Sequence, residues 1–175
     1  MSSNEGHRPD LELISEHFRH PRHFGAIPDA DITMPGGNPG CGDVVVIHLK
    51  ADGDRLVDVR WEGQGCTVSQ AGTSMLLDEV HRAGLSPEAI LEMDYHHMEE
   101  LLGSEVVKAR PRCATLGLAT LKGAVRAWQR RRALAEGGVQ PPSGPPPGGD
   151  APEMLGVVLG EGAREAAGPG IPHDP

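Results

Sequence analysis

The stretch VVVIHLKADGDRLVDVRWEGQGCTVSQ, residues 44–70, decides the fold of this chain. A β-branched run over residues 44–51 is followed by an Asp-Gly-Asp turn, and residues 56–62 then alternate between apolar and polar side chains. Two such runs around a short turn predict an antiparallel hairpin with one polar face. The residues predicted to share the apolar face of the second strand are Val57, Val59 and Trp61.

Beyond this hairpin the spacing of apolar residues changes from that of a strand to that of a helix. Thr67-Val68-Ser69-Gln70 has the pattern of a capping box, so we expect a helix with Thr67 as its N-cap and Gln70 reaching back to it. Pro87 and Asp94 predict the starts of two shorter helices. A last helix is predicted to begin just after Cys113.

Upstream of the hairpin, apolar residues recur at helical spacing from Leu11 to Phe18, and Pro21 predicts the end of that helix. A third short strand is expected near residues 30–34. Strands that follow one another and then give way to consecutive helices favour the α+β class over a doubly wound parallel sheet. Because Pro21 breaks the helical register, the three nearby histidines are interpreted as surface residues: His17, His20 and His23.

Length and charge narrow the class of protein. A chain of 175 residues predicts one domain with an extension, and a net charge of −9 argues against binding to the phosphate backbone of a nucleic acid. There is no apolar run of about 18 residues, so no membrane span is expected. The polar N-terminus shows no signal-peptide pattern, and we therefore expect a cytoplasmic protein with reduced thiols.

The composition of the chain changes after Glu136. Residues 137–175 include ten glycines and nine prolines and carry a net negative charge. Such a segment buries too little apolar surface to offset its conformational entropy. We therefore predict a folded domain over residues 1–136 and a disordered acidic tail over residues 137–175, in which the apolar run at 154–159 is interpreted as a chance feature.

Three cysteines carry the chemical information. They lie in Asn38-Pro39-Gly40-Cys41-Gly42-Asp43, in Gly63-Gln64-Gly65-Cys66-Thr67 and in Arg110-Pro111-Arg112-Cys113-Ala114-Thr115. Spacings of 25 and 47 residues prevent any two of them from sharing a local loop, so only the fold can bring them together. Three thiolates with Asp43 as fourth ligand would make a tetrahedral site for zinc or an iron–sulfur cluster.

The chemistry of these thiols favours a bound cation. A helix N-terminus behind Cys66 or Cys113 lowers a thiol pKa by about one unit, which leaves most of the thiol protonated at pH 7. The carboxylate of Asp43 opposes even this shift, whereas a metal ion deprotonates thiols and accepts a carboxylate. The alternative is that each cysteine only fills the core, as lone cysteines commonly do. One oxygen ligand among thiolates suggests a site that releases what it holds.

Taken together, the three cysteine motifs resemble those of the NifU N-terminal/IscU/SufU family of iron–sulfur cluster assembly proteins, with the SufU branch the most similar. The segment from His17 to Gly25 also resembles the N-terminal signature of that family. The resemblance spans roughly residues 11–132. It implies a small three-stranded antiparallel sheet with helices packed on one face. Arg112 stands where IscU-type scaffolds carry a histidine, and their Leu-Pro-Pro-Val-Lys segment is missing.

The same resemblance implies that Cys41, Asp43, Cys66 and Cys113 are the ligands of zinc or of a transient iron–sulfur cluster. The implied partners are a cysteine desulfurase that hands over a persulfide sulfur, and apo iron–sulfur proteins or downstream SUF components. Cys41 and Cys113 are then the candidate catalytic thiols. Three functions remain open: a SufU-like sulfur acceptor, a scaffold on which a labile [2Fe–2S] cluster is built, and a structural zinc module that only binds a partner.

Overall fold

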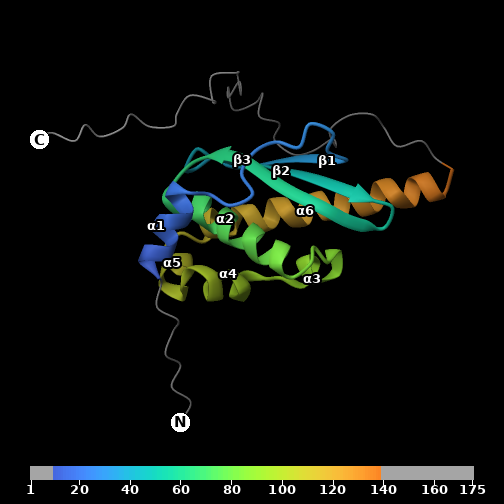
Figure 1. Cartoon of the computed structure of the whole chain (residues 1–175). Helices are drawn as coiled ribbons and strands as arrows, with labels where there is room; N and C mark the ends of the chain where they lie inside the picture. The colour runs from blue at the N-terminus through green and yellow to red at the C-terminus, as the bar shows by residue number, and fades with distance from the viewer. Residues whose placement is uncertain (1–9, 139–175) are drawn as a thin grey trace, which may run out of the picture.

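The computed structural model describes residues 10–138, in which three strands form one antiparallel sheet in the order β1–β2–β3 (Figure 1). The strands are β1 (Ile32–Asn38), β2 (Asp43–Asp52) and β3 (Arg55–Gln64). Every second residue of β2 points toward the helices. Val45, Ile47 and Leu49 are therefore fully buried, and the predicted hairpin of β2 and β3 is confirmed.

The strand predicted near residues 30–34 is confirmed as β1, which extends further along the chain to Asn38. It pairs with β2 in continuous register, from Ile32 opposite Leu49 to Asn38 opposite Asp43. A side chain at Gly36 would overlap Thr120 of the last helix. The glycine thus lets that helix approach the sheet closely.

The predicted position of Val57 on the buried face is wrong. Lys50 pairs with Asp58 and Ala51 pairs with Leu56, so Val57 has no partner on β2. This extra residue is a β-bulge, and it reverses the alternation of faces toward the turn. Leu56 is consequently buried in its place, while Val57 is exposed.

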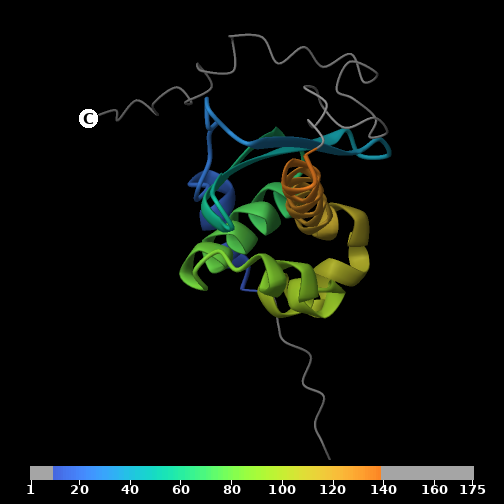
Figure 2. The same cartoon turned by 90° about the vertical axis from the view of Figure 1, so that its right-hand side faces the viewer.

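Six helices of the described region cover one face of the sheet (Figure 2). They are α1 (Leu11–Arg19), α2 (Thr67–Arg82), α3 (Pro87–Glu92), α4 (Tyr95–Leu102), α5 (Ser104–Ala109) and α6 (Pro111–Glu136). Helix α6 packs on β1 and β2, whereas α2 packs on β3 and on α6. The α+β class is confirmed. Within the residues described, no helix combines the length and apolarity needed to cross a bilayer.

Helix α1 packs against α2, and this contact corrects the interpretation of His17 as a surface residue. The side chain of His17 is buried, and its Nδ1 lies 2.8 Å from Oγ of Ser74. Burial lowers the pKa of His17, which favours the neutral ring in this contact. Helical spacing places His17 one turn after the buried Ile14, on the face that α2 covers.

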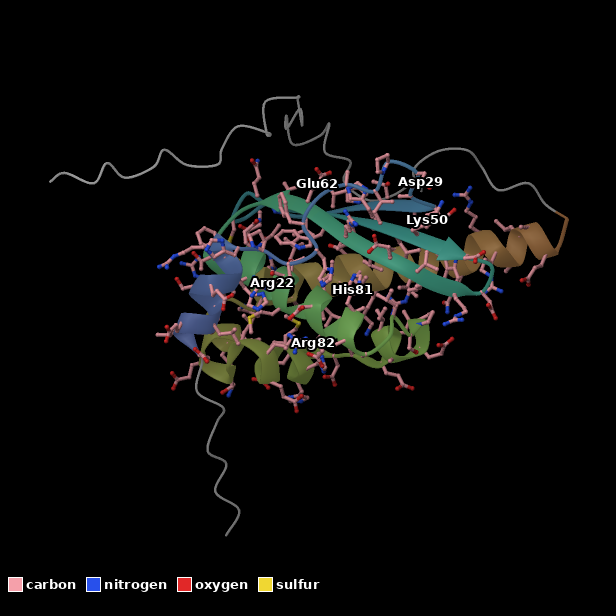
Figure 3. All side chains as sticks on the ribbon, in the orientation of Figure 1. Arg22, Asp29, Lys50, Glu62, His81 and Arg82 are labelled. Atoms are coloured by element: carbon pink, nitrogen blue, oxygen red, sulfur yellow. The ribbon has the colours of Figure 1, made fainter. Side chains whose placement is uncertain are left out.

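The segment between α1 and β1 runs from one edge of the sheet to the other. At the β3 edge, Gly25 N–H donates to the carbonyl of Trp61 at 2.8 Å, and the ring of His23 stacks on that of His81 at 3.7 Å. Figure 3 shows Asp29 beside Lys50 of β2, and the two side chains form an ion pair at 3.1 Å. These contacts fix α1 against the rest of the fold.

Two glycines of α6 give a stability prediction that depends on helix packing. A Cβ at Gly117 would lie 3.0 Å from Cβ and 3.1 Å from Cα of Thr73 in α2, so we expect Gly117→Ala to lower the free energy of unfolding by about 1–3 kcal/mol. A Cβ at Gly123 would meet only Met34, at 3.7 Å or more. Gly123→Ala should therefore raise stability by about 0.5–1 kcal/mol, because alanine favours a helix. Chemical denaturation of both variants measures the two changes in the free energy of unfolding, which should have opposite signs. Equal changes in the two variants would contradict this packing.

Candidate metal centre

One end of the sheet brings together three elements that are far apart in the sequence. They are the turn between β1 and β2, the N-terminus of α2 and the N-terminus of α6 (Figure 1). Each of these elements carries one cysteine. All three cysteines are free thiols in the structure.

Cys41 lies at the tip of the turn between β1 and β2. Its backbone N–H donates to the carbonyl of Asn38 at 3.0 Å, and that of Gly42 donates to the same oxygen at 2.9 Å. Gly42 has a φ of +70°, a conformation that glycine adopts without strain. The turn thus exposes Cys41 while holding its sulfur 3.5 Å from the sulfur of Cys113.

Asp43 is the first residue of β2, and strand alternation explains why its side chain is buried. It lies on the same face as Val45, two residues further along, and is only 1% exposed. Its Oδ1 accepts a hydrogen bond of 2.8 Å from the backbone N–H of Cys66. A side chain at Gly65 would overlap this carboxylate, and Gly65 also has a φ of +156°. Glycine at that position therefore leaves room for Asp43.

Cys66 is the N-cap of α2, and this corrects the prediction that Thr67 occupies that position. Cys66 has extended backbone angles, and Thr67 is already the first helical residue. Gln70 does reach back, but not to Thr67. With its amide oriented to suit its neighbours, the Gln70 side-chain oxygen accepts from the N–H groups of Gln64 and Gly65 at 3.2 Å. The sulfur of Cys66 makes no capping bond and lies 3.8 Å from Oδ2 of Asp43.

Cys113 lies inside α6, not before it as predicted. The helix begins at Pro111, so Cys113 is in the first turn and its side chain is only 2% exposed. Burial raises the pKa of the Cys113 thiol, and hydrogen bonds involving Asp43, Cys41 and Cys66 raise it further. These effects outweigh the small decrease in the pKa of Cys113 that was expected from the helix N-terminus. A cation among these groups would reverse the balance, because it favours the thiolate.

Donor atoms of three of the four candidate ligands converge closely enough to share a metal ion. Ligand atoms of Cys41, Asp43 and Cys113 all lie within 4.8 Å of one another. Cys66 is outside that mutual set but adjoins the same carboxylate. Zinc with bonds of about 2.3 Å to sulfur separates two sulfurs by about 3.8 Å. The 3.5 Å between the sulfurs of Cys41 and Cys113 is close to this value.

One polar residue of the site is absent from the candidates named from the sequence. Asn38, the last residue of β1, is buried, and its Nδ2 donates to the sulfur of Cys113 at 3.6 Å. It opens the first of the three cysteine motifs that carry the family resemblance, but it was not among the candidate site residues. Arg110 and Arg112, close to Cys113 in the sequence, are exposed and form no ion pair with any described residue.

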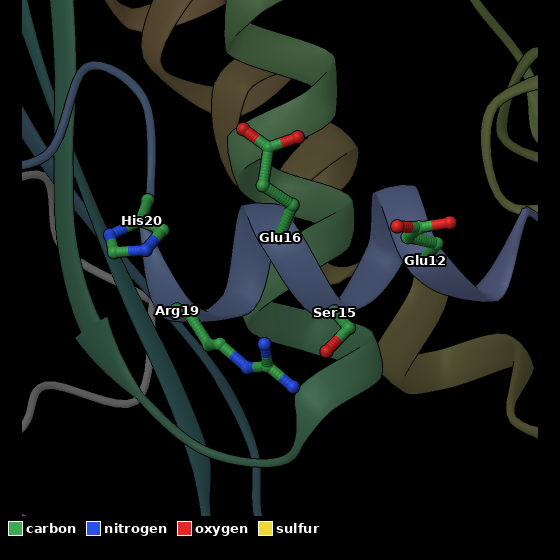
Figure 4. A pocket seen from close by; sticks show the side chains of 5 residues that line it. All are labelled: Glu12, Ser15, Glu16, Arg19 and His20. Atoms are coloured by element: carbon green, nitrogen blue, oxygen red, sulfur yellow. The ribbon is translucent and has the colours of Figure 1, made fainter.

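A shallow hollow elsewhere on the surface does not belong to this site. It is lined by residues of α1 and the position just after it, among them Glu12, Arg19 and His20 (Figure 4). No cysteine lines it, and it borders one helix instead of the junction of three elements. The candidate chemistry therefore lies with the cysteines, not with this hollow.

Comparisons with known proteins agree with this geometry. A domain described as "NifU-like N terminal domain" matches residues 11–135. The chain is 31% identical over 131 residues to a Bacillus subtilis protein named zinc-dependent sulfurtransferase SufU, a match covering 65% of this chain and 87% of that protein. It is 30% identical over 120 residues to an Archaeoglobus fulgidus iron–sulfur cluster assembly scaffold protein, IscU 1, covering 69% and 76% of the two chains.

A solved structure shares the fold. The N-terminal part of a NifU-like protein from Brucella abortus superposes with a TM-score of 0.52 at 19% identity, over 69% of this chain and 94% of that one. The matched domain covers well over half of the present chain, from α1 nearly to the end of α6. The chain therefore belongs to the NifU-like N-terminal domain family.

Proposed function

We propose that this protein is a sulfur acceptor in iron–sulfur cluster assembly, which takes persulfide sulfur from a cysteine desulfurase at Cys41. One observation carries the proposal: the sulfur of Cys41 belongs to the group of converging donor atoms and yet lies on an exposed turn. A thiol in that position can be held by a metal and still be reached by another protein. The relative named as a zinc-dependent sulfurtransferase supports this choice.

The transfer step needs no outside oxidant or reductant. The thiolate of Cys41 attacks the outer, protonated sulfur of the desulfurase persulfide, and a new sulfur–sulfur bond forms as the old one breaks. The electron pair of the broken bond leaves with the desulfurase thiolate, and the proton stays on the transferred sulfur. Bound zinc would keep the thiols deprotonated at neutral pH. The zinc would be held by four ligands: Cys41, Asp43, Cys66 and Cys113. We place the protein in the cytoplasm, where thiols stay reduced.

A second candidate function is a scaffold on which a labile [2Fe–2S] cluster is built and passed to apo-proteins or downstream SUF components. The observation that favours it is Asp43, whose buried carboxylate faces the thiols. A carboxylate is a harder ligand than a thiolate and suits a cluster that must leave. A purely structural zinc module remains the third candidate, and the exposure of Cys41 speaks against it.

The test is to purify the protein without oxygen, measure zinc, iron and sulfide, and incubate it with a cysteine desulfurase and cysteine. Thiols are then trapped with an alkylating reagent, and persulfides are located by mass spectrometry. The proposal expects about one zinc per chain and persulfide on Cys41. Iron with sulfide and charge-transfer bands would favour the scaffold, while equal protection of all three cysteines without persulfide would favour the structural module.

A further inference from the structure

The three thiols of the candidate centre differ in their surroundings. Cys41 is exposed at a turn, Cys66 is half-buried at a helix cap, and Cys113 is buried in the first turn of α6. A metal site built from unlike thiolates does not release them equally, because hydrogen bonds to sulfur and solvent access tune each one.

Asn38 contacts Cys113, the turn that carries Cys41, and Asp43 from a single position. Its side chain is only 6% exposed, and its Nδ2 lies 3.6 Å from the sulfur of Cys113. Its backbone carbonyl accepts the hydrogen bonds that shape the Cys41 turn. It also pairs directly with Asp43 across the two strands, so both side chains lie on the helix-facing side of the sheet.

We propose that Asn38 is a positioning residue that donates an N–H···S hydrogen bond to Cys113 and makes this thiolate the retained, less nucleophilic donor of the metal centre. An N–H donor withdraws electron density from a thiolate, which lowers its reactivity toward electrophiles. Cys41 has no such side-chain donor among the described residues apart from the thiol of Cys113. Cys41 is also the exposed one of the three cysteines, so we assign the reactive role to it. The purpose of this difference between the thiols rests on the proposed function. The hydrogen bond between Asn38 and Cys113 does not depend on sulfur transfer.

The test compares Asn38→Leu, which keeps the branched shape without the donor, with Asn38→Ala. In zinc-loaded protein, alkylation is followed by mass spectrometry at each cysteine. Both variants are expected to alkylate Cys113 about two- to tenfold faster than wild type, as the loss of one hydrogen bond implies. In cobalt-substituted protein, the thiolate-to-metal charge-transfer band should move to lower energy, because the thiolate becomes a stronger donor.

Ser69→Ala is the matched control, because its hydroxyl lies 3.8 Å from the sulfur of Cys66 and serves a different thiol. It should leave the alkylation rate of Cys113 unchanged. Unchanged Cys113 rates and an unchanged cobalt spectrum in folded Asn38 variants would overturn the proposal.

A measurement on the wild type covers the case in which the Asn38 variants do not fold. In ¹¹³Cd-loaded protein, a scalar coupling between the side-chain amide protons of Asn38 and the metal through sulfur is expected, and its absence would reject the hydrogen bond. None of these measurements uses a desulfurase. A failure of sulfur transfer would therefore be distinguishable from a failure of this inference.

Discussion

Replacing Cys41 by alanine is expected to abolish persulfide transfer from a cysteine desulfurase while leaving the fold intact. Cys41 is exposed at the tip of a turn whose hydrogen bonds are made by backbone atoms. The substitution therefore removes only the part-buried contact between its sulfur and that of Cys113. It does remove the one cysteine of the candidate centre that is exposed and that a second protein can reach. Desulfurase turnover in the presence of the variant should fall to that of the desulfurase alone. The variant lacks the nucleophile that accepts the sulfur, and no other thiol of the centre is expected to replace it.

A comparison with Cys66→Ala separates the loss of a metal ligand from the loss of the acceptor. Both variants lose one candidate donor of the same centre, and zinc content is measured for each. After a single turnover, persulfide trapping should find sulfur on Cys41 in Cys66→Ala and on no cysteine in Cys41→Ala. Retained desulfurase stimulation by Cys41→Ala, or sulfur on its Cys113, would show that Cys41 is not the acceptor.

Much of the fold could be predicted from the period of the apolar residues. The run from Val44 and the alternation that ends at Trp61 are long enough to identify two strands, and both were confirmed. The bulge at Val57 could not be predicted, because an extra residue in one strand shows only when its partner strand is known. His17 was misplaced for a similar reason. Its burial depends on Ser74, which lies 57 residues away in α2.

The candidate centre could be predicted only as a set of residue types. Glycine and capping motifs marked the neighbourhoods of the cysteines. They nevertheless placed the N-cap of α2 at Thr67 instead of Cys66, and the start of α6 after Cys113 instead of at Pro111. Helix boundaries depend on backbone angles that several neighbouring residues could supply equally well. The role of Asn38 could not be predicted at all from local sequence. Its contact with the sulfur of Cys113, 75 residues away, exists only because the fold packs β1 against α6.

The position of Asp43 explains why one oxygen donor matters to the rest of the centre. Its carboxylate is buried, holds the backbone N–H of Cys66 with one oxygen and faces the sulfur of Cys66 with the other. The same side chain thus sets the start of α2 and offers a hard ligand among soft ones. A cluster bound there would be held less firmly at Asp43 than at the cysteines.

If the centre carries a [2Fe–2S] cluster, Asp43→Ala is expected to slow release of that cluster to an apo-acceptor. Removing the carboxylate leaves the cluster to the three thiolates, which bind iron more covalently. Asp43→Cys should slow release further, since four thiolates are typical of permanent clusters. The variants are reconstituted without oxygen and mixed with an apo-ferredoxin, and transfer is followed by the change in visible absorption.

Asp52→Ala is the matched control, because Asp52 is an exposed aspartate at the other end of the same strand, and it should release cluster at the wild-type rate. Asp43→Ala also leaves the N–H of Cys66 without its acceptor, which costs about 1–3 kcal/mol of stability, so release is compared at a temperature where every variant is folded. Equal release rates for wild type and Asp43→Ala would mean that the carboxylate does not make the cluster labile. Its role would then be to hold Cys66 at the start of α2, and the centre would fit the zinc-bound sulfur acceptor better than the scaffold.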